Sequence, residues 1–426
     1  MTTSDSRTVG QSDGPWPPWR CFPATALVLA VLSLSPTVRL SSQDYRAQAL
    51  RILKTVPLID GHNDIPDAIR QRGGVDSVDF AVLQPKLMTD IPKLRAGAVG
   101  GQFWAAYVPV TTLDSGPHPA VYALEQIDLI KRLCARYPRD LAMAYSAAEV
   151  ERNFKAGRIS CLIGIEGGHA IENSLGALRM FASLGVRYIT LTHWRSLSWA
   201  TASTDTARRG LSAFGREVVH EMNRLGILVD LSHVNDGTMS DALHAARAPV
   251  MFSHSSARAL THHARDVPDS ILKLVPPNGG IVMVNFNPGF VSEAVRVYGD
   301  SLEARTRALR AAGTDSAPLR DSVRAWQARA PKATLQQVAD HIDYLRRVVG
   351  VDHVGLGSDF DGITEVPVGL EDVSKFPDLI AELLRRGWTE QDVQKVAGLN
   401  LLRVLRGAER VAAAGNSKAR RTDAPR

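Results

Sequence analysis

The feature that most constrains the fold is a repeated unit, in which a short apolar run is followed by a segment with helical periodicity. Eight such runs occur, at residues 55–60, 100–109, 159–166, 186–193, 226–233, 248–254, 279–286 and 353–360. They are nearly continuously apolar, as parallel strands covered on both faces must be. Segment 212–226 is typical of the intervening helices, because apolar residues from Phe214 to Leu225 form one stripe and Gly226 ends it.

The number of units favours a closed parallel barrel over an open doubly wound sheet. A doubly wound sheet is expected to have fewer strands and a Gly-rich phosphate-binding turn after the first, and no such turn follows residue 60. The sequence therefore predicts an α/β fold of the (β/α)8 TIM-barrel type. In such a barrel the C-terminal ends of all strands open on one face, where catalytic groups lie.

Metal-ligating side chains cluster at these predicted strand ends. The stretch "VPLIDGHNDIP" (56–66) runs from a strand into a loop that carries an imidazole and a carboxylate two residues apart. The strand-end residues with such side chains are His62, Asp64, Glu166, His193, His233, His254 and Asp359. One histidine at a strand end is usually a structural residue. Four of the twelve histidines together with three carboxylates on one face indicate a functional site.

Neutral imidazoles and carboxylates without a thiolate suit zinc or a similar first-row divalent ion. Two ions fit better than one, because the set exceeds the three protein ligands of a typical mononuclear zinc site. A carboxylate can bridge two ions about 3.5 to 4 Å apart. Glu166 lies between the His62/Asp64 pair and the His233/His254 pair in chain order, so we expect it to be the bridge.

Other hydrolase constellations are less complete. The sequence contains no G-x-S-x-G elbow and no H-E-x-x-H motif, which argues against serine hydrolases and zincins. Cys134 and Cys161 have no histidine partner at a strand end. Ser255 and Ser256 follow His254 directly, and serines beside a metal ligand more often support the site or form a turn.

Several motifs, arriving in order, resemble the membrane dipeptidase (renal dipeptidase) family of binuclear zinc peptidases over residues 45–407. The motifs are "DGHNDIP", "PKLRAGAVGGQFWAAYVP", "IEGGHAIENSL", "LTHW", "DLSHV", "FSHSSARAL" and "GSDFDG". The resemblance implies a barrel with a binuclear metal site on its C-terminal face. It also implies hydrolysis of dipeptides, including those with a C-terminal D-residue, by a metal-bridging hydroxide, and some members of the family open β-lactam rings.

The same resemblance assigns roles to individual residues. It implies two Zn²⁺ per chain, with His62 and Asp64 at one ion, His233 and His254 at the other, and Glu166 between them. His193 matches the histidine that contacts substrate and steadies the tetrahedral intermediate. Arg265, in "HHARDVPD", matches the arginine that grips the dipeptide carboxylate, although an ion pair with Asp266 or Asp269 is the alternative. Asp359 matches the acid/base on the amine side of the scissile bond.

The chain departs from the family pattern in three places. Arg195 lies where a family disulfide would have a cysteine, and the polar C-terminus gives no signal for a glycolipid anchor. The connection at 298–331 is longer than expected and has the pattern of two charged helices. It follows the seventh strand on the active-site face, which leaves a lid, a homodimer contact and a solvated excursion open.

An apolar run near the N-terminus suggests export. Residues 22–36, "FPATALVLAVLSLSP", are too short to span a bilayer comfortably and have the size of a signal-peptide core. We therefore expect residues 1–40 to be a signal peptide or an uncleaved membrane anchor, residues 41–407 to form the barrel, and residues 408–426 to be a polar disordered tail. The expected location is periplasmic or extracellular.

The charge of the chain and its intact site residues narrow the range of possible functions. The net charge of +6 comes largely from arginines at 301–330 and in the tail, without interleaved aromatic residues, so nucleic-acid binding is not expected. The main hypothesis is an exported zinc dipeptidase whose partners are small dipeptides. The alternatives are a related amidohydrolase acting on N-acyl amino acids or β-lactams, and a non-catalytic binding protein on the same barrel. The last would be expected to have lost a ligand or proton-transfer residue, and none is lost here.

Overall fold

The computed structural model describes residues 42–207, 209–311 and 317–422, so the expected export segment lies outside the described residues. Nine strands form one parallel sheet: β1 (Leu58–Asn63), β2 (Val99–Tyr107), β3 (Leu141–Met143), β4 (Ile159–Glu166), β5 (Val186–Thr190), β6 (Leu228–Asp230), β7 (Met251–Phe252), β8 (Ile281–Val284) and β9 (Val354–Leu356). The order is β2-β1-β9-β8-β7-β6-β5-β4, and β2 also pairs with β4 along Gly101–Tyr107, which closes the barrel. The expected (β/α)8 barrel is confirmed.

The strands differ from the sequence-based expectation in two ways. The short strand β3, which pairs with the first residues of β4, was not expected, because its apolar residues, Leu141–Met143, are only three and none is β-branched or aromatic. Six strands also end earlier than expected, and the early ends of β5, β6, β7 and β9 leave His193, His233, His254 and Asp359 in the loops that follow them. Regular pairing stops there because the chain must turn these side chains inward, and two of them have a left-handed backbone, with φ 68° at His233 and 64° at Asp359.

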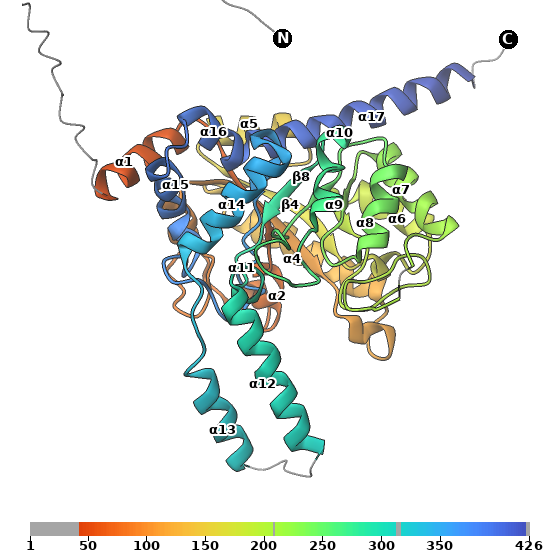
Figure 1. The fold of residues 1–426 in the computed structure, drawn as a ribbon. Coiled ribbons are helices and arrows are strands. Elements are labelled where there is room, and N and C mark those ends of the chain that lie inside the picture. Colours follow the sequence, from red (N-terminus) through yellow and green to blue (C-terminus); the bar gives the residue numbers. More distant parts are fainter. Residues whose placement is uncertain (1–41, 208, 312–316, 423–426) are drawn as a thin grey trace, which may run out of the picture. The chain divides into compact units, whose positions relative to one another are not determined.

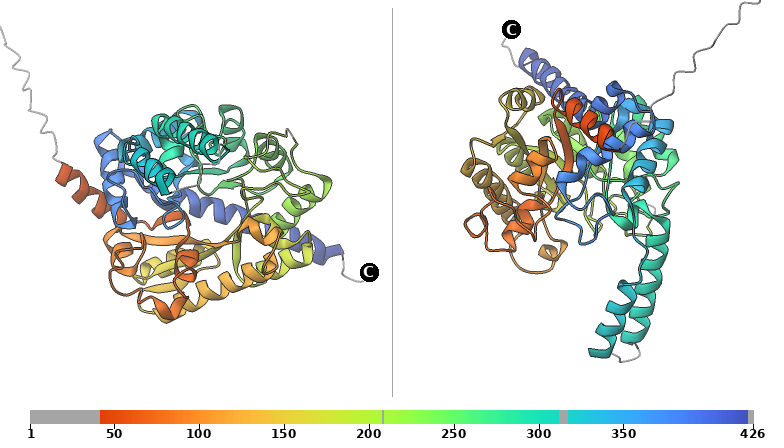
Figure 2. Two further views of the ribbon diagram at one scale, coloured as in Figure 1. Left: turned by 90° about the horizontal axis from the view of Figure 1, so that it is seen from below. Right: turned by 90° about the vertical axis from the view of Figure 1, so that its left-hand side faces the viewer.

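Helices surround the barrel, and their colours in Figure 2 follow the chain order around the ring. They are α2 (Ile65–Arg70), α3 (Ile91–Ala96), α4 (Pro119–Arg136), α5 (Ala147–Lys155), α6 (Leu175–Ser183), α7 (Ala213–Leu225), α8 (Asp236–Ala245), α9 (Asp269–Leu272), α10 (Val275–Asn278), α11 (Pro288–Val291), α14 (Leu335–Val349), α15 (Phe376–Arg385) and α16 (Glu390–Gln394). Several begin at a capping side chain that accepts a backbone N–H three residues on, as Ser146, Ser174, Ser212 and Asn235 do. Helix α1 (Ser42–Leu53) precedes β1 and packs on α15.

The barrel interior is filled by side chains rather than open. Ile59, Phe103, Leu162, Tyr188 and Met251 belong to one fully buried cluster from five strands. The same cluster includes residues of α5 and of α17 (Asn400–Thr422), which follows the π-helical turn η6 (Lys395–Leu399). A Cβ at Gly164 would lie 2.0 Å from the Tyr188 ring, so glycine is required for this ring to cross the barrel. The interior therefore forms a rigid base beneath the C-terminal face.

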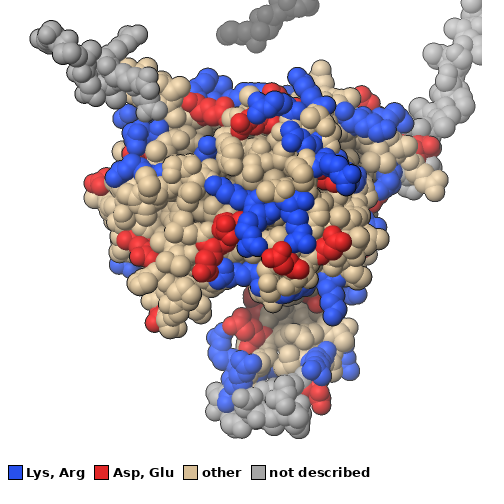
Figure 3. All heavy atoms as spheres, turned by 180° about the vertical axis from the view of Figure 1, so that it is seen from behind, with Lys and Arg blue, Asp and Glu red and all other residues tan. Residues whose placement is uncertain are grey.

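The connection after β8 forms a hairpin of two helices, α12 (Glu293–Ala311) and α13 (Ala317–Gln327), that projects from the barrel (Figure 1). The expected charged helices are confirmed, although the first begins five residues before 298. The guanidinium of Arg305 lies 4.4 Å from the Trp326 ring centroid, and the Tyr298 hydroxyl donates to the Trp326 carbonyl at 2.6 Å. In the view of Figure 3, basic and acidic side chains are interspersed on the barrel and the hairpin.

The expectation of a disordered tail from residue 408 was wrong for most of that segment. Helix α17 continues to Thr422, well beyond its buried residues such as Leu405 and Ala408. The sequence "AERVAAAG" favours this extension because alanine has the highest helix propensity. An ion pair of 2.5 Å between Arg406 and Glu151 of α5 joins α17 to the barrel. None of the described helices is both long and apolar enough to cross a membrane.

Candidate metal centre

The first pair of candidate ligands comes from β1. His62 is the fifth residue of this strand, and Asp64 follows it at the position just before α2. Their Nε2 and Oδ2 atoms lie 3.1 Å apart. The other ring nitrogen of His62, Nδ1, lies 2.7 Å from the Tyr188 hydroxyl, which reaches across the barrel from β5. This hydrogen bond fixes the imidazole so that Nε2 faces the mouth.

The second pair comes from the loops after β6 and β7. The Nε2 atoms of His233 and His254 face each other at 2.9 Å. Nδ1 of His254 lies 2.8 Å from the Ser253 hydroxyl, which orients this ring as Tyr188 orients that of His62. Nδ1 of His233 is buried and has no hydrogen-bond partner among the described residues. Two facing imidazole nitrogens with no other group between them are the arrangement expected around a shared cation.

Glu166, the last residue of β4, lies between the two pairs. Its Oε2 is 3.7 Å from His62 Nε2, whereas its Oε1 is 3.0 Å from His233 Nε2 and 3.4 Å from His254 Nε2. Each carboxylate oxygen thus faces a different pair of candidate ligands. Glu166 therefore lies between the two pairs in space, as its place in chain order suggested.

A buried carboxylate beneath the first pair was not predicted from the sequence. Asp60 is fully buried in β1, and its Oδ1 accepts hydrogen bonds from the backbone N–H groups of Ser358 (2.8 Å) and His62 (3.4 Å). Its Oδ2 accepts from the Ser358 hydroxyl (2.6 Å) and from Gln102 Nε2 (2.8 Å). Asp60 therefore ties β1 to the loop after β9.

A second buried carboxylate, also missed, holds the other pair. Asp230, the last residue of β6, accepts through Oδ1 from the backbone N–H groups of Ser232 (3.1 Å) and Ser253 (2.8 Å). Its Oδ2 accepts from the Ser253 hydroxyl at 2.7 Å and from the Thr190 hydroxyl. The signal was present in the sequence, since each aspartate precedes a candidate ligand histidine by two or three residues in "DGH" and "DLSH".

His193 and Asp359, predicted to act on substrate, lie beside the cluster. Nε2 of His193 is 3.9 Å from Glu166 Oε1, and its ring packs edge-on against Tyr107 with centroids 5.0 Å apart. Asp359 is partly buried, and its Oδ2 accepts a hydrogen bond of 2.9 Å from Asn285 Nδ2. Ligand atoms of His62, His254 and Asp359 lie within 4.8 Å of one another, as do those of Glu166, His193 and His233.

Arg265 is 1% exposed, and no carboxylate among the described residues lies within ion-pair distance of it. Its guanidinium donates to the Ser255 hydroxyl (3.3 Å) and to the His254 carbonyl (3.2 Å). The alternative ion pair with Asp266 or Asp269 is not formed, because Asp266 accepts from the Ser256 backbone and Asp269 from Tyr344. A buried guanidinium without an anion is suited to an anionic ligand.

These side chains open on a cavity of about 370 Å³ on the C-terminal face. Its lining includes predicted residues and others that the sequence did not indicate: Asp64, Asp67, Gln71, Tyr107, Glu166, His193, Trp194, His233, Arg265, Asn287, Phe290, Asp359, Asp361, Gly362, Ile363 and Thr364. All eight predicted site residues therefore lie in or directly beneath one cavity. His62 and His254 are the two that lie beneath it.

The residues fit a pair of divalent ions. Burial lowers the pKa of His233 and of His254 well below the usual range, aided by neighbouring cationic groups, so these imidazoles are in the neutral form that binds metal. Burial also lowers the pKa of His62, but Asp64 and Glu166 outweigh it and raise this pKa to about 10. The carboxylates around His62 thus favour positive charge, and Asp64 Oδ1 is buried without a hydrogen-bond partner among the described residues.

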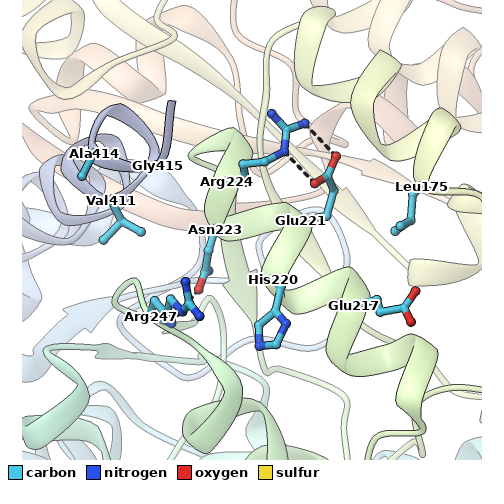
Figure 4. Close-up of a pocket in the computed structure, with 10 residues that line it drawn as sticks. All are labelled: Leu175, Glu217, His220, Glu221, Asn223, Arg224, Arg247, Val411, Ala414 and Gly415. Carbon is cyan, nitrogen blue, oxygen red and sulfur yellow. Dashed lines mark hydrogen bonds and ion pairs between the residues drawn. The ribbon is translucent and has the colours of Figure 1, made fainter. Parts of the chain in front are cut away.

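A second hollow, of about 590 Å³, lies between α6, α7 and α17 (Figure 4). Glu221 and Arg224 form a hydrogen-bonded ion pair there at 2.7 Å, and Glu217 and His220 line it on the same helix. None of the predicted site residues lines this hollow. Although larger, it therefore lacks the convergent donor set of the cavity at the metal centre.

Comparison with known proteins agrees with this geometry. The sequence model of the membrane dipeptidase family, peptidase family M19, matches residues 46–419. The chain belongs to this family. It is 41% identical to Dipeptidase 3 of Rattus norvegicus over 375 residues, which cover 86% of this chain and 68% of that protein. As a member of the membrane dipeptidase family, the chain is a metal-binding hydrolase of peptide bonds, and the resemblance inferred from its motifs is confirmed.

Solved structures show the same fold. The probable dipeptidase PvdM of Pseudomonas aeruginosa superimposes with a TM-score of 0.74 at 23% identity, covering 87% of this chain and all of that one. A metallopeptidase of Rhodobacter sphaeroides, liganded with a phosphinate mimic of the dipeptide L-Ala-D-Ala, gives a TM-score of 0.67 at 27% identity and covers 83% of this chain and 99% of that one. The barrel is therefore common to this chain and to solved dipeptidases.

Proposed function

We propose that this chain is a zinc-dependent dipeptidase with two ions per chain. The observation that carries the proposal is the position of Glu166, whose two oxygens face different histidine sets at 3.7 Å and at 3.0 and 3.4 Å. His62 and Asp64 would hold one ion, His233 and His254 would hold the other, and Glu166 would contribute to both. Zinc is favoured because the donors are imidazoles and carboxylates without a thiolate. Bound divalent ions supply Lewis-acid chemistry, polarising a carbonyl and acidifying a water.

Arg265 binds the free carboxylate of the dipeptide. Its guanidinium lies between two aromatic rings, 5.9 Å from the centroid of Trp194 and 5.4 Å from that of Phe290. These rings exclude water and hold the fork in one orientation, which strengthens a bidentate contact to a carboxylate. A relative's structure holds an analogue with a D-residue on the carboxyl side. We propose that this chain accepts such dipeptides as well.

His193 and Asp359 act on the two sides of the scissile bond. The His193 ring, fixed against Tyr107, places Nε2 next to Glu166, where it donates to the oxygen of the substrate carbonyl as negative charge develops. Asp359, held by Asn285, takes a proton from the attacking water and passes it to the departing amine. Ordinary proton transfer by a positioned carboxylate contributes roughly 10²- to 10⁴-fold to the rate.

The location of the enzyme is also a proposal. The apolar run at 22–36 has the features of an export signal, and the barrel begins at β1, well after this run. We propose that residues 1–40 direct export and that residues 41–407 form the catalytic domain, with the helical hairpin as an insertion in it.

Metal analysis combined with a substrate panel tests the proposed function. The purified full chain should contain two equivalents of zinc, and removal of the metal by a chelator should abolish activity until zinc is restored. The panel compares L,L- and L,D-dipeptides with dipeptide amides, N-acetyl amino acids and a β-lactam. Turnover of free dipeptides well above the other classes supports the proposal. Preference for N-acetyl amino acids or for the β-lactam would assign the related amidohydrolase activity instead.

A further inference from the structure

Two ends of the catalytic cavity differ in charge. Arg265 lies on the loop that follows β7, whereas Asp67 lies on α2, which follows β1, and both line the cavity. In the strand order β2-β1-β9-β8-β7-β6-β5-β4, β7 is opposite β2 and three positions from β1. Asp67 is held over the β2 side by residues of α4, the helix that follows β2. The candidate metal centre therefore lies between a basic end and an acidic end.

The Asp67 carboxylate is held by neutral groups. Gln71 Nε2 donates to Oδ2 at 2.6 Å, Gln126 Nε2 donates to Oδ1 at 3.1 Å, and the Tyr122 hydroxyl lies 3.4 Å from Oδ1. No Lys, Arg or His of the described residues forms an ion pair with Asp67. The nearest arginine along the chain, Arg70, instead pairs with Glu125 at 2.6 Å.

A second carboxylate that lines the same cavity belongs to the loop after β9. Asp361 accepts a hydrogen bond of 2.8 Å from the Met88 backbone N–H, and no ion pair to it forms within the described residues. Burial raises the pKa of Asp67, as expected for a buried carboxylate whose hydrogen-bond donors are all neutral. A cation entering from the cavity would supply the missing compensation.

The length of a dipeptide determines which part of it reaches this end. Two residues in extended form span roughly 7 Å. With the carboxylate at Arg265 and the scissile bond over the metal cluster, the first residue extends toward α2. Resting on the proposed dipeptidase activity, we propose that Asp67, assisted by Asp361, makes the enzyme select dipeptides whose first residue has a cationic side chain, lysine or arginine.

Paired substrates that differ only in the side-chain charge test this specificity. Lysyl-alanine and norleucyl-alanine have side chains of similar length, and the lysine is charged at neutral pH. The zinc-loaded native enzyme should show a kcat/KM about five- to tenfold higher for lysyl-alanine, the size expected of one modest ion pair. Asp67→Asn should bring that ratio close to one. Asp128→Asn, which removes an exposed carboxylate from the outer face of α4, is the matched control and should keep the native ratio.

Binding measurements separate this inference from the proposed function. Calorimetric titration with the phosphinate analogues of both dipeptides reports the charge preference even if neither dipeptide is hydrolysed, and Asp67→Ser serves if Asp67→Asn does not fold. A native ratio at or below one would overturn the inference. So would an equal loss for both compounds in the Asp67 variants, because Asp67 would then bind the ammonium group that all dipeptides share or would only support the metal centre. Absence of hydrolysis with a retained binding ratio would overturn the proposed activity alone.

Discussion

The two halves of the metal centre have the same backbone support and opposite electrostatics. We call the first the β1/β9 half, which consists of Asp60, His62, Asp64, Ser358 and Asp359. We call the second the β6/β7 half, which consists of Asp230, Ser232, His233, Ser253 and His254. In each half, one carboxylate oxygen of a fully buried aspartate accepts hydrogen bonds from two backbone N–H groups. The other oxygen accepts hydrogen bonds from a serine hydroxyl and from a side chain of a neighbouring strand. In each half one residue has a left-handed backbone, Asp359 in the first and His233 in the second.

The charges built on this common support differ. Asp64 and Asp359 surround His62 with carboxylates, and the pKa of His62 rises to about 10 because these and Glu166 outweigh burial. The β6/β7 half presents imidazoles and lies next to the Arg265 guanidinium, so burial and positive neighbours hold the pKa values of His233 and His254 well below the usual range. Buried aspartates therefore set the geometry of both halves, while the residues at the loop tips set their charge.

Glu166 is the residue that both halves share, so its removal should have the largest effect. Glu166→Ala should lower the metal content from two ions to one or none and reduce kcat/KM by at least about 10³-fold, which is roughly 4 kcal/mol. The measurement is metal analysis with dipeptide kinetics. Glu217→Ala, on the exposed face of α7 (Figure 4), is the control and should retain both ions. A Glu166→Ala enzyme that keeps two ions and full activity would show that the halves are independent.

Arg265 is the cation that distinguishes the β6/β7 half. If it grips the substrate carboxylate, Arg265→Met should cost roughly 2 to 5 kcal/mol in kcat/KM for free dipeptides, the range for truncating one partner of a buried charge pair. Dipeptide amides lack this carboxylate, so they should be poor substrates of the native enzyme and lose little more on mutation. Measuring both substrates with both proteins closes a double-mutant cycle. Equal losses on acid and amide would make Arg265 a structural residue.

Because Asp60 and Asp230 make equivalent hydrogen bonds, substituting either one should reduce stability and metal affinity by similar amounts. Asp60→Asn and Asp230→Asn should each lower the free energy of unfolding by about 2 to 4 kcal/mol, because each places an amide N–H₂ opposite donors in a buried site. Each should also weaken the ion of its own half about 10- to 100-fold. Denaturant unfolding and competitive chelator titration measure the two effects. Equal weakening of both ions in either variant would contradict the division into halves.

The loop that follows β7, next to the β6/β7 half, should be sensitive to acid because a buried histidine contacts it. His341 of α14 is buried, its Nδ1 accepts the Ala257 backbone N–H at 3.0 Å, and burial lowers its pKa to about 4. The unfolded chain, with a histidine pKa near 6.5, binds this proton at higher pH than the folded chain. Stability from this group is therefore fully present above pH 6.5 and is lost as pH falls toward 4, by about 2 kcal/mol between pH 7 and pH 5. Unfolding free energies at both pH values, for the native protein and for His341→Asn, measure this loss, and an equal acid sensitivity in the variant would assign it elsewhere.

The sequence predicted those site residues whose side chains can bind metal and which lie at the ends of predicted strands. His62, Glu166 and His254 could be predicted because metal-binding side chains at the ends of parallel strands must meet on one face. The strand ends themselves could not be placed, because the loop conformations that turn His233 and Asp359 inward depend on tertiary contacts rather than on local propensity.

The supporting residues were harder to predict than the ligands. Asp60 and Asp230 look like any polar residue near a strand end until their serine partners, distant in sequence, are brought beside them. The contact of His341 with the loop at Ala257 could not be predicted, because helical periodicity does not show which loop a side chain packs against. The extent of α17 beyond Ala408 was missed because the polar composition of the segment concealed its helix propensity.

The smallest predicted effect comes from the hydroxyl groups that orient one ligand in each half. Nδ1 of His62 lies 2.7 Å from the Tyr188 hydroxyl, and Nδ1 of His254 lies 2.8 Å from that of Ser253. Tyr188→Phe keeps the ring that packs against Gly164, so it removes one hydrogen bond and should weaken the ion of the β1/β9 half by about 1 kcal/mol, or roughly fivefold. Ser253→Ala should weaken the ion of the β6/β7 half by more, because that hydroxyl also donates to Asp230. Chelator titration of both variants gives the two affinities separately, and a Tyr188→Phe effect on the His233/His254 ion would show that the barrel interior couples the halves.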